Sequence, residues 1–127
     1  MRIERTDFVA VPVTEVGRSA RFYGEVLGLD KNPNSLEDWI EFETGNLTLA
    51  LVSAEGHGRE FAPLPRGSVA LRVADLAAAK AKLEAAGVEC GDTWDSGVCN
   101  GFSFSDPDGN GLLLHHRYAP YPDGTKP

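Results

Sequence analysis

The chain has 127 residues, of which 42% are hydrophobic and 24% charged, a composition typical of a folded globular domain. Its net charge of −7 disfavours nucleic acid as a partner, because a protein that binds a phosphate backbone must neutralise it with Lys and Arg. The same charge favours cationic or neutral small molecules as ligands. No apolar run approaches the roughly 20 residues that span a bilayer, and the N-terminus lacks the apolar core of a signal peptide. Two cysteines make no disulfide framework, so we expect a cytoplasmic protein that binds neither nucleic acid nor membrane.

The first half of the chain has the pattern strand, helix, strand, strand. Residues 8–13 are rich in strand-forming residues, and Pro12 among them indicates the edge of a sheet or the end of a strand. Residues 39–43 alternate as a half-buried strand does, and residues 47–52 form a second apolar run after a turn. A short additional strand fits near residues 31–36.

A helix is predicted between the first two strands. Thr14 can cap its start, and Gly28 stands where a helix commonly ends. Its apolar residues recur at three- and four-residue spacing, which places them on one helical face: Val16, Ala20, Tyr23 and Leu27.

The second half repeats this pattern about 60 residues later, since residues 68–76 match residues 8–16. Asp75 is the expected cap of a second helix, which carries Leu76 and Leu83 and ends at Gly87. Residues 88–92 are expected to form a short strand. We therefore predict one domain of two modules, residues 5–53 and 68–118, joined by a Gly- and Pro-rich linker at 54–67 and followed by an extended tail at 119–127.

The last two strands form a predicted hairpin around residues 106–110, whose sequence is Asp-Pro-Asp-Gly-Asn. Proline presets φ for a turn, and glycine and asparagine tolerate a positive φ. Phe102 and Phe104 alternate with serines, so the first strand is expected to bury one face, whereas the continuous Leu112 to Leu114 suggest a second strand covered on both faces.

These features resemble the vicinal oxygen chelate superfamily, which includes glyoxalase I, bleomycin-resistance proteins and extradiol dioxygenases. The resemblance rests on Phe22-Tyr23, on residues 26–29 (Val-Leu-Gly-Leu), on the repeated unit and on the turn at 106–110. It implies an α+β fold of two tandem βαβββ modules that form a cup-shaped mixed sheet. Because the superfamily contains both enzymes and non-catalytic binders, the fold alone does not decide the function.

The resemblance also implies where a metal would bind. Enzymes of the superfamily hold a divalent ion with His or Glu at the start of each module and Glu on each last strand. The matching residues here are Phe8, Thr48, Ser68 and Leu113, none of which is a normal ligand for such an ion. We therefore expect neither a metal nor another cofactor.

The candidate ligand-binding residues are mostly aromatic: Phe8, Trp39, Glu41, Trp94, Cys99, Phe102, Phe104 and His115, with Glu43 as an alternative polar anchor. Aromatic faces stack on flat ligands. Cys99 and His115 lie on adjacent predicted strands, so a reactive Cys–His pair is one interpretation and a small buried Cys99 is another. A disulfide between Cys90 and Cys99 is a further alternative. His57, between two glycines of the linker, is expected to be solvated.

The favoured function is metal-independent binding of a small hydrophobic or aromatic molecule, such as an antibiotic, for resistance or self-protection. The bleomycin-resistance branch that the chain resembles further implies a homodimer. A carrier protein in natural-product biosynthesis would use the same pocket. The alternative is an enzyme (lyase, isomerase or dioxygenase) that uses His115 with Glu41 or Glu43 as an atypical metal site, or His115 as an acid/base.

Overall fold

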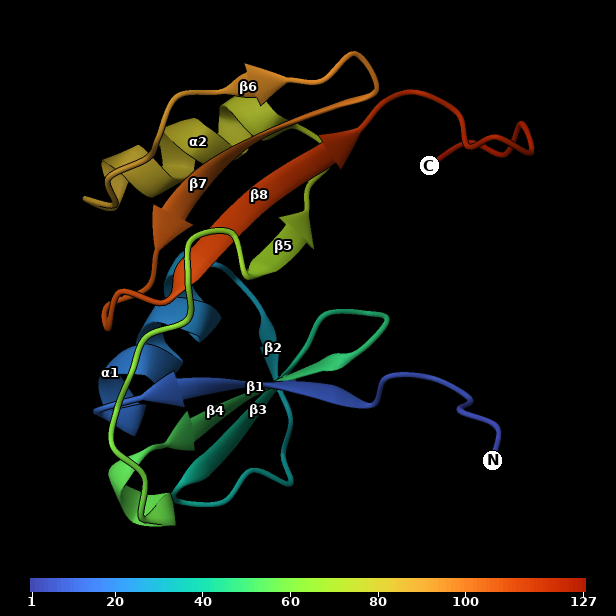
Figure 1. Ribbon diagram of the computed structural model, residues 1–127. Coiled ribbons are helices and arrows are strands. Elements are labelled where there is room, and N and C mark those ends of the chain that lie inside the picture. Colours follow the sequence, from blue (N-terminus) through green and yellow to red (C-terminus); the bar gives the residue numbers. More distant parts are fainter. The chain divides into compact units, whose positions relative to one another are not determined.

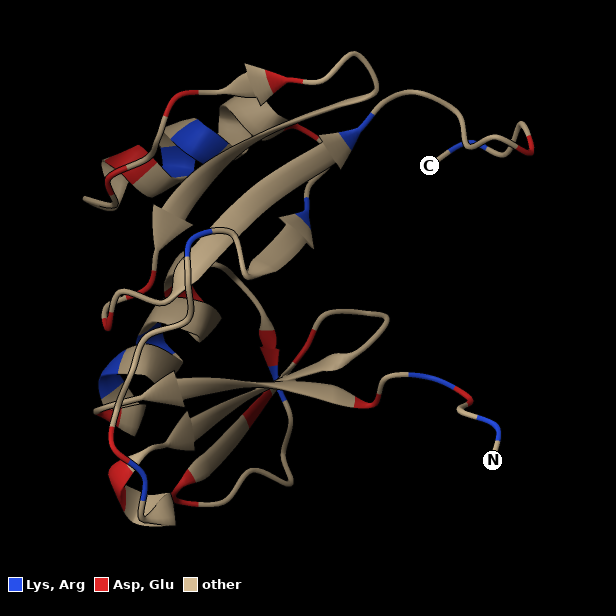
Figure 2. Ribbon diagram, viewed as in Figure 1, with Lys and Arg blue, Asp and Glu red and all other residues tan.

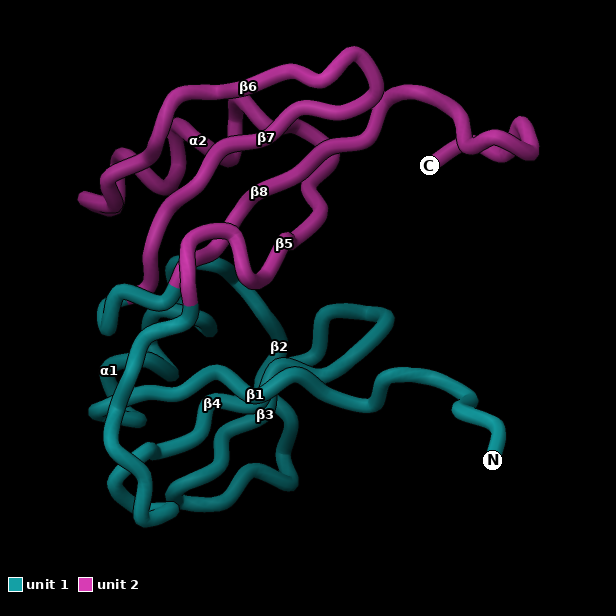
Figure 3. The backbone as a smooth tube through the Cα atoms, in the orientation of Figure 1, with its two compact units in different colours: residues 1–64, 107–110 teal, residues 65–106, 111–127 magenta.

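The computed structural model describes all 127 residues of the chain. Its elements follow the order β1–α1–β2–β3–β4 in the first half and β5–α2–β6–β7–β8 in the second (Figure 1), which confirms the predicted α+β fold of two βαβββ modules. The chain divides into two compact units (Figure 3): residues 1–64 with 107–110, and residues 65–106 with 111–127. No helix is both long and apolar enough to cross a bilayer.

The first unit contains one four-stranded sheet in the order β1-β4-β3-β2. β1 and β4 are parallel, and β4, β3 and β2 are antiparallel neighbours. β1 pairs on one side alone, so the expected edge position of Pro12 is confirmed. The elements are β1 (Phe8–Val13), α1 (Val16–Arg21), a π-helical turn η1 (Phe22–Val26), β2 (Asp30–Lys31), β3 (Trp39–Glu43), β4 (Thr48–Ser53) and a 3-10 turn η2 (Glu55–His57).

The predicted first helix is present, but its second half is π-helical. The Leu27 N–H donates to the Phe22 carbonyl at 3.0 Å, five residues back. This wider turn buries Phe22 and Tyr23 together, and the Tyr23 ring lies 6.2 Å from that of Phe42 in β3. Gly28 follows with φ +72°, as expected for the residue that ends a helix.

The second unit repeats the arrangement in the order β5-β8-β7-β6, with β5 parallel to β8. The Asp75 side chain accepts a hydrogen bond from the Ala78 N–H at 2.9 Å, so the predicted cap is confirmed, and Leu76 and Leu83 are buried. The elements are β5 (Val69–Arg72), α2 (Leu76–Ala85), β6 (Trp94–Asp95), β7 (Cys99–Ser105) and β8 (Gly111–Arg117).

The prediction of a strand at residues 88–92 is wrong. This segment has no strand structure, and the short strand β6 begins instead at Trp94. The Gly91 N–H donates to the Ser103 carbonyl at 2.8 Å, while the Gly91 carbonyl accepts from Lys80 of α2 at 2.9 Å. The segment therefore runs along β7 without a regular ladder, because one of its backbone groups is bound by a side chain.

The β7–β8 hairpin is confirmed. Ser105 pairs with Gly111, and residues 106–110 form the turn, in which Gly109 has φ +84°. Leu112 and Leu114 are buried, but Leu113 is half-buried on the opposite face. The expectation that β8 is fully covered on both faces is thus wrong at Leu113.

Candidate functional site

The first unit has one buried and one open sheet face, because side chains alternate along each strand. α1 contacts β3 and β4, and the buried set on that side includes Val11, Phe42, Leu49 and Leu51. The register pairs Phe8 with Thr48, and Ala50 with both Ala10 and Glu41, on the other face. The residues of β1 and β3 that point away from α1 therefore face the open side.

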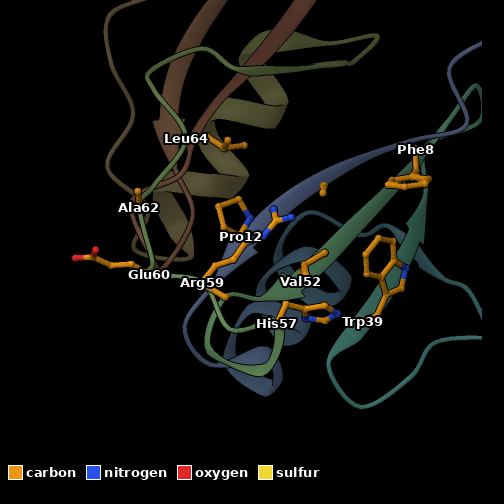
Figure 4. Close-up of a pocket in the computed structure, with 11 residues that line it drawn as sticks. Phe8, Pro12, Trp39, Val52, His57, Arg59, Glu60, Ala62 and Leu64 are labelled. Atoms are coloured by element: carbon orange, nitrogen blue, oxygen red, sulfur yellow. The ribbon is translucent and has the colours of Figure 1, made fainter.

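A pocket of about 520 Å³ lies on this open face (Figure 4). Its volume is within the range of small-molecule sites. Strands β1, β3 and β4 supply its floor with Phe8, Ala10, Pro12, Trp39 and Val52, and the segment that follows β4 supplies Ala54, His57, Arg59, Glu60, Ala62 and Leu64.

Two aromatic rings form the apolar centre of the pocket. Phe8 and Trp39 are in edge-to-face contact, with ring centroids 5.3 Å apart and an interplanar angle of 80°. The Trp39 indole N–H donates to a Glu41 carboxylate oxygen at 2.8 Å, which fixes the orientation of the indole. Phe8 is 49% exposed, so its ring surface is available to a ligand. Glu41 therefore does not line the pocket itself but orients Trp39, which does.

His57 also lines the pocket, with its ring 6.1 Å from that of Trp39. Its Nδ1 lies 3.0 Å from the Ser53 carbonyl oxygen. Because a carbonyl oxygen accepts and cannot donate, Nδ1 carries the proton, and Nε2 is the acceptor in the neutral ring. His57 is exposed, as expected for the linker, but its role as a pocket wall was not predicted.

Asn110 connects the segment after β4, which forms the wall of the pocket, to β1, which forms part of its floor. Its side-chain amide donates to the Pro12 carbonyl at 2.7 Å, and its Oδ1 accepts from the Leu64 N–H at 2.8 Å. Asn110 is completely buried. A residue of the predicted turn thus satisfies an edge carbonyl of β1 and a backbone N–H of the linker at once.

The remaining predicted residues lie in the second unit. Trp94 and His115 are in ring contact, with centroids 6.1 Å apart. Cys99 shares their sheet face by register, but it contacts the Ser96 hydroxyl at 3.3 Å and forms no hydrogen bond with His115. The geometry thus gives no support to a Cys–His pair.

Phe102 and Phe104 point to the opposite face of β7 and are buried in the core of the second unit. The Lys80 ammonium of α2 lies 5.4 Å from the centre of the Phe102 ring. These two rings are therefore not part of the candidate site, because the core of the second unit already covers their surface.

The residues at the family's metal positions do not fit a metal ion. Phe8 and Thr48 face each other across β1 and β4, but a phenyl ring offers no ligand and one hydroxyl is insufficient. Leu113 pairs with Ala70, two residues after Ser68. No group of three or more His, Cys, Asp or Glu side chains could hold an ion anywhere in the chain.

Both cysteines are free, so the disulfide alternative is wrong. Burial, and then the charge of Glu84, raise the pKa of the Cys90 thiol. The Lys80 charge lowers this pKa by a smaller amount. Cys90 is therefore less ionised than an ordinary thiol and less reactive as a nucleophile.

Solved structures that are similar to this chain include binders and enzymes. TnmS3, an antibiotic-binding protein from a Streptomyces strain, is 25% identical, with a TM-score of 0.77 over 92% of this chain and 98% of that chain. A superfamily member from Sphaerobacter thermophilus is 20% identical (TM-score 0.78; 91% and 98% covered). A lactoylglutathione lyase from Agrobacterium tumefaciens is 18% identical (TM-score 0.74; 91% and 96% covered). The last two likenesses concern the fold alone.

Among curated proteins, no sequence matches this chain. The family model of the Glyoxalase/Bleomycin resistance protein/Dioxygenase superfamily matches residues 5–114, most of the chain and both βαβββ modules. The repeat, the turn at 106–110 and the two sheets thus have a common explanation: the chain belongs to the glyoxalase/bleomycin resistance protein/dioxygenase superfamily.

Proposed function

We propose that this protein binds a small, flat aromatic molecule in the pocket of its first unit and does so without a metal ion. The single observation that carries the proposal is the edge-to-face pair of the Phe8 and Trp39 rings, which both line a pocket of about 520 Å³. An antibiotic is the ligand class that we favour, with resistance or self-protection as the consequence of binding. A carrier role in natural-product biosynthesis would use the same pocket.

The composition of the pocket supports binding more than chemistry. Aromatic side chains contribute about 0.5–1.5 kcal/mol each to a ring contact beyond the area that they bury. A nucleophile needs a base within hydrogen-bond distance, and the pocket is lined by no Ser, Thr, Cys or Lys side chain. The edge-to-face pair leaves ring surface for a third aromatic group, which an apolar ligand can supply.

The likeness to TnmS3 supports an antibiotic as the ligand class, since that protein is described as antibiotic-binding and is 25% identical to this chain.

Fluorescence titration tests the proposal directly. Trp39 is one of two tryptophans, so the Trp94→Phe variant leaves Trp39 as the only indole reporter. Titration of this variant with 2-naphthamide, a neutral flat probe, should quench the Trp39 emission saturably. Calorimetry with Zn²⁺, Ni²⁺, Mn²⁺ and Fe²⁺ should give no stoichiometric binding. An unquenched Trp39 across a panel of flat aromatic compounds, or stoichiometric metal binding, would contradict the proposal.

The enzymatic alternative depends on His115, which lies in the second unit beside Trp94. The His115 ring contacts the Trp94 indole, 6.1 Å away between ring centroids, and not a carboxylate that would fix its tautomer as an acid/base catalyst would require. If the protein turned over a ligand, and His115→Ala abolished that turnover while the ligand still bound, the sequestration proposal would be wrong.

We also propose that the protein acts in the cytoplasm as a homodimer. The start of the C-terminal tail is fixed to the second unit, because the Tyr118 hydroxyl donates to Asp95 at 2.7 Å and Arg117 lies over the Tyr121 ring at 4.5 Å. Tyr118 and Tyr121 remain 43% and 44% exposed, and they offer aromatic surface to a second copy. Deletion of residues 119–127 should shift sedimentation towards the monomer, and an unchanged dimer would rule out this role of the tail.

A further inference from the structure

The residues that β1 and β4 contribute to the floor of the pocket carry no charge. β1 and β4 contain no Lys, Arg, Asp or Glu, as the ribbon coloured by charge shows (Figure 2). The charged residues that line the pocket, Arg59 and Glu60, both come from the linker after β4. Glu41 of β3 lies beside the pocket, but its carboxylate accepts the Trp39 indole N–H. Arg59 and Glu60 are therefore the charged side chains that line the pocket itself.

Arg59 and Glu60 point in different directions. In Figure 4 the Arg59 side chain extends along Pro12 towards the interior of the pocket, whereas the Glu60 carboxylate points away from it. The Arg59 side chain forms no hydrogen bond or ion pair with another residue of the chain. By contrast, the Arg18 guanidinium pairs with Asp108, and that of Arg117 donates to the Ala119 carbonyl at 3.0 Å.

The other side-chain donors of the pocket are already used. The Trp39 indole N–H donates to Glu41, and His57 Nδ1 donates to the Ser53 carbonyl. All other lining side chains except Glu60 are apolar. The guanidinium of Arg59 is thus the one uncommitted side-chain donor of the pocket, and it is also a full positive charge.

We infer that the ligand is a flat aromatic molecule that carries an anionic oxygen, a carboxylate or a phenolate, and that Arg59 binds this oxygen while Phe8 and Trp39 hold the ring. The inference rests on the proposed function, since it specifies the ligand of the same pocket. A guanidinium matches the geometry of a carboxylate and forms charge-assisted hydrogen bonds with it. This preference is opposite to the one expected from the net charge of −7, because a short-range contact in a pocket outweighs a distant, screened field.

A matched pair of probes tests the inference. 2-Naphthoate and 2-naphthamide share one ring system and nearly one shape, and at about pH 7 only the first is anionic. Calorimetry on the full chain should show 2-naphthoate binding about tenfold more tightly, the difference that 1.4 kcal/mol produces. Arg59→Gln should remove this preference, while Arg59→Lys should keep part of it.

Arg21→Gln is the control, because it removes one exposed positive charge from the same unit and lies outside the pocket. It should preserve the preference for 2-naphthoate. If both probes bind equally to the wild type, or if Arg59→Gln and Arg21→Gln reduce the preference to the same extent, the inference is wrong and the proposed function stands. If neither probe binds, the inference is also wrong. If in addition no compound of the flat aromatic panel quenches Trp39, the proposed function fails with it.

Discussion

Asp108 accepts hydrogen bonds from both the backbone N–H and the hydroxyl of Thr14, 94 positions earlier in the chain, at 2.9 and 2.5 Å. The same carboxylate pairs with Arg18 in α1 and is 3% exposed. The residue that starts α1, Glu15, provides no side-chain cap, and Thr14, expected to cap the helix, instead donates to Asp108. The turn of the second module thus supplies the carboxylate that stabilises the start of α1.

The pKa of Asp108 should make the stability of the protein fall in acid. Burial raises this pKa, but the Thr14 hydrogen bonds and the Arg18 charge outweigh burial and hold it below the ordinary value of 3.8. The carboxylate therefore contributes its full stability above about pH 4, and this contribution disappears as the pH falls through the lowered pKa. Urea unfolding of the wild type should show this loss.

Asp108→Asn should lower the free energy of unfolding by about 1–3 kcal/mol at neutral pH. It should also make this free energy depend less on pH in acid. Asp92→Asn is the control, because Asp92 is exposed and makes no side-chain hydrogen bond or ion pair. Parallel stability curves for the wild type and Asp108→Asn below about pH 4 would show that this carboxylate is unimportant for α1.

Asn110→Ala should destabilise the first unit by about 2–4 kcal/mol, since it leaves the Pro12 carbonyl and the Leu64 N–H without a partner. Asn110→Asp keeps an acceptor for Leu64 but places a carboxylate oxygen against the Pro12 carbonyl, so it should be at least as harmful. Thermal unfolding measures both changes. A melting temperature within about 1 °C of the wild type for Asn110→Ala would contradict the bridging role, because one kcal/mol shifts it by several degrees.

Gly111→Ala should be strongly destabilising because there is no room for a side chain. A Cβ at this position would lie 2.1 Å from the Pro65 carbonyl oxygen and 2.5 Å from the Arg66 Cα, both backbone atoms of the second unit. Gly17→Ala is the matched control: it lies in α1 with contacts no closer than 3.6 Å, and it should stabilise the helix by about 0.5–1 kcal/mol. Equal urea midpoints for the two variants would contradict the claim that there is no room for a side chain at Gly111.

Trp39→Ala should weaken the binding of 2-naphthamide about tenfold, through the loss of one ring contact and of buried area. Glu41→Ala should weaken it less, by about threefold, because it frees the indole without removing it. Trp94→Ala, in the second unit, is the control and should leave the affinity unchanged. Calorimetry distinguishes these cases, and equal losses for Trp39→Ala and Trp94→Ala would contradict the location of the site.

The sequence predicted local features better than the site. The hairpin at 106–110, the edge position of Pro12 and the cap by Asp75 follow from short-range rules, and all three are confirmed. A period of two predicts that Phe102 and Phe104 share a face, but it does not tell whether that face is open or covered by a helix. In the structure, α2 covers it.

His57 and Arg59 were missed for a related reason. They belong to a Gly- and Pro-rich segment without periodicity, and its position over the open face depends on the contact between Leu64 and Asn110, 46 residues apart. No local pattern predicts such a contact. The prediction of a strand at 88–92 was wrong for the same reason. Lys80 of α2 binds the Gly91 carbonyl, 11 residues away, and no local pattern predicts this contact.

The most direct test of the central claim is to map 2-naphthamide binding by backbone amide chemical shifts on the full chain. We expect saturable shifts at Phe8, Trp39, Val52 and His57, with those around Trp94 and His115 unchanged. Shifts confined to Trp94 and His115 would place the ligand in the second unit and contradict the account.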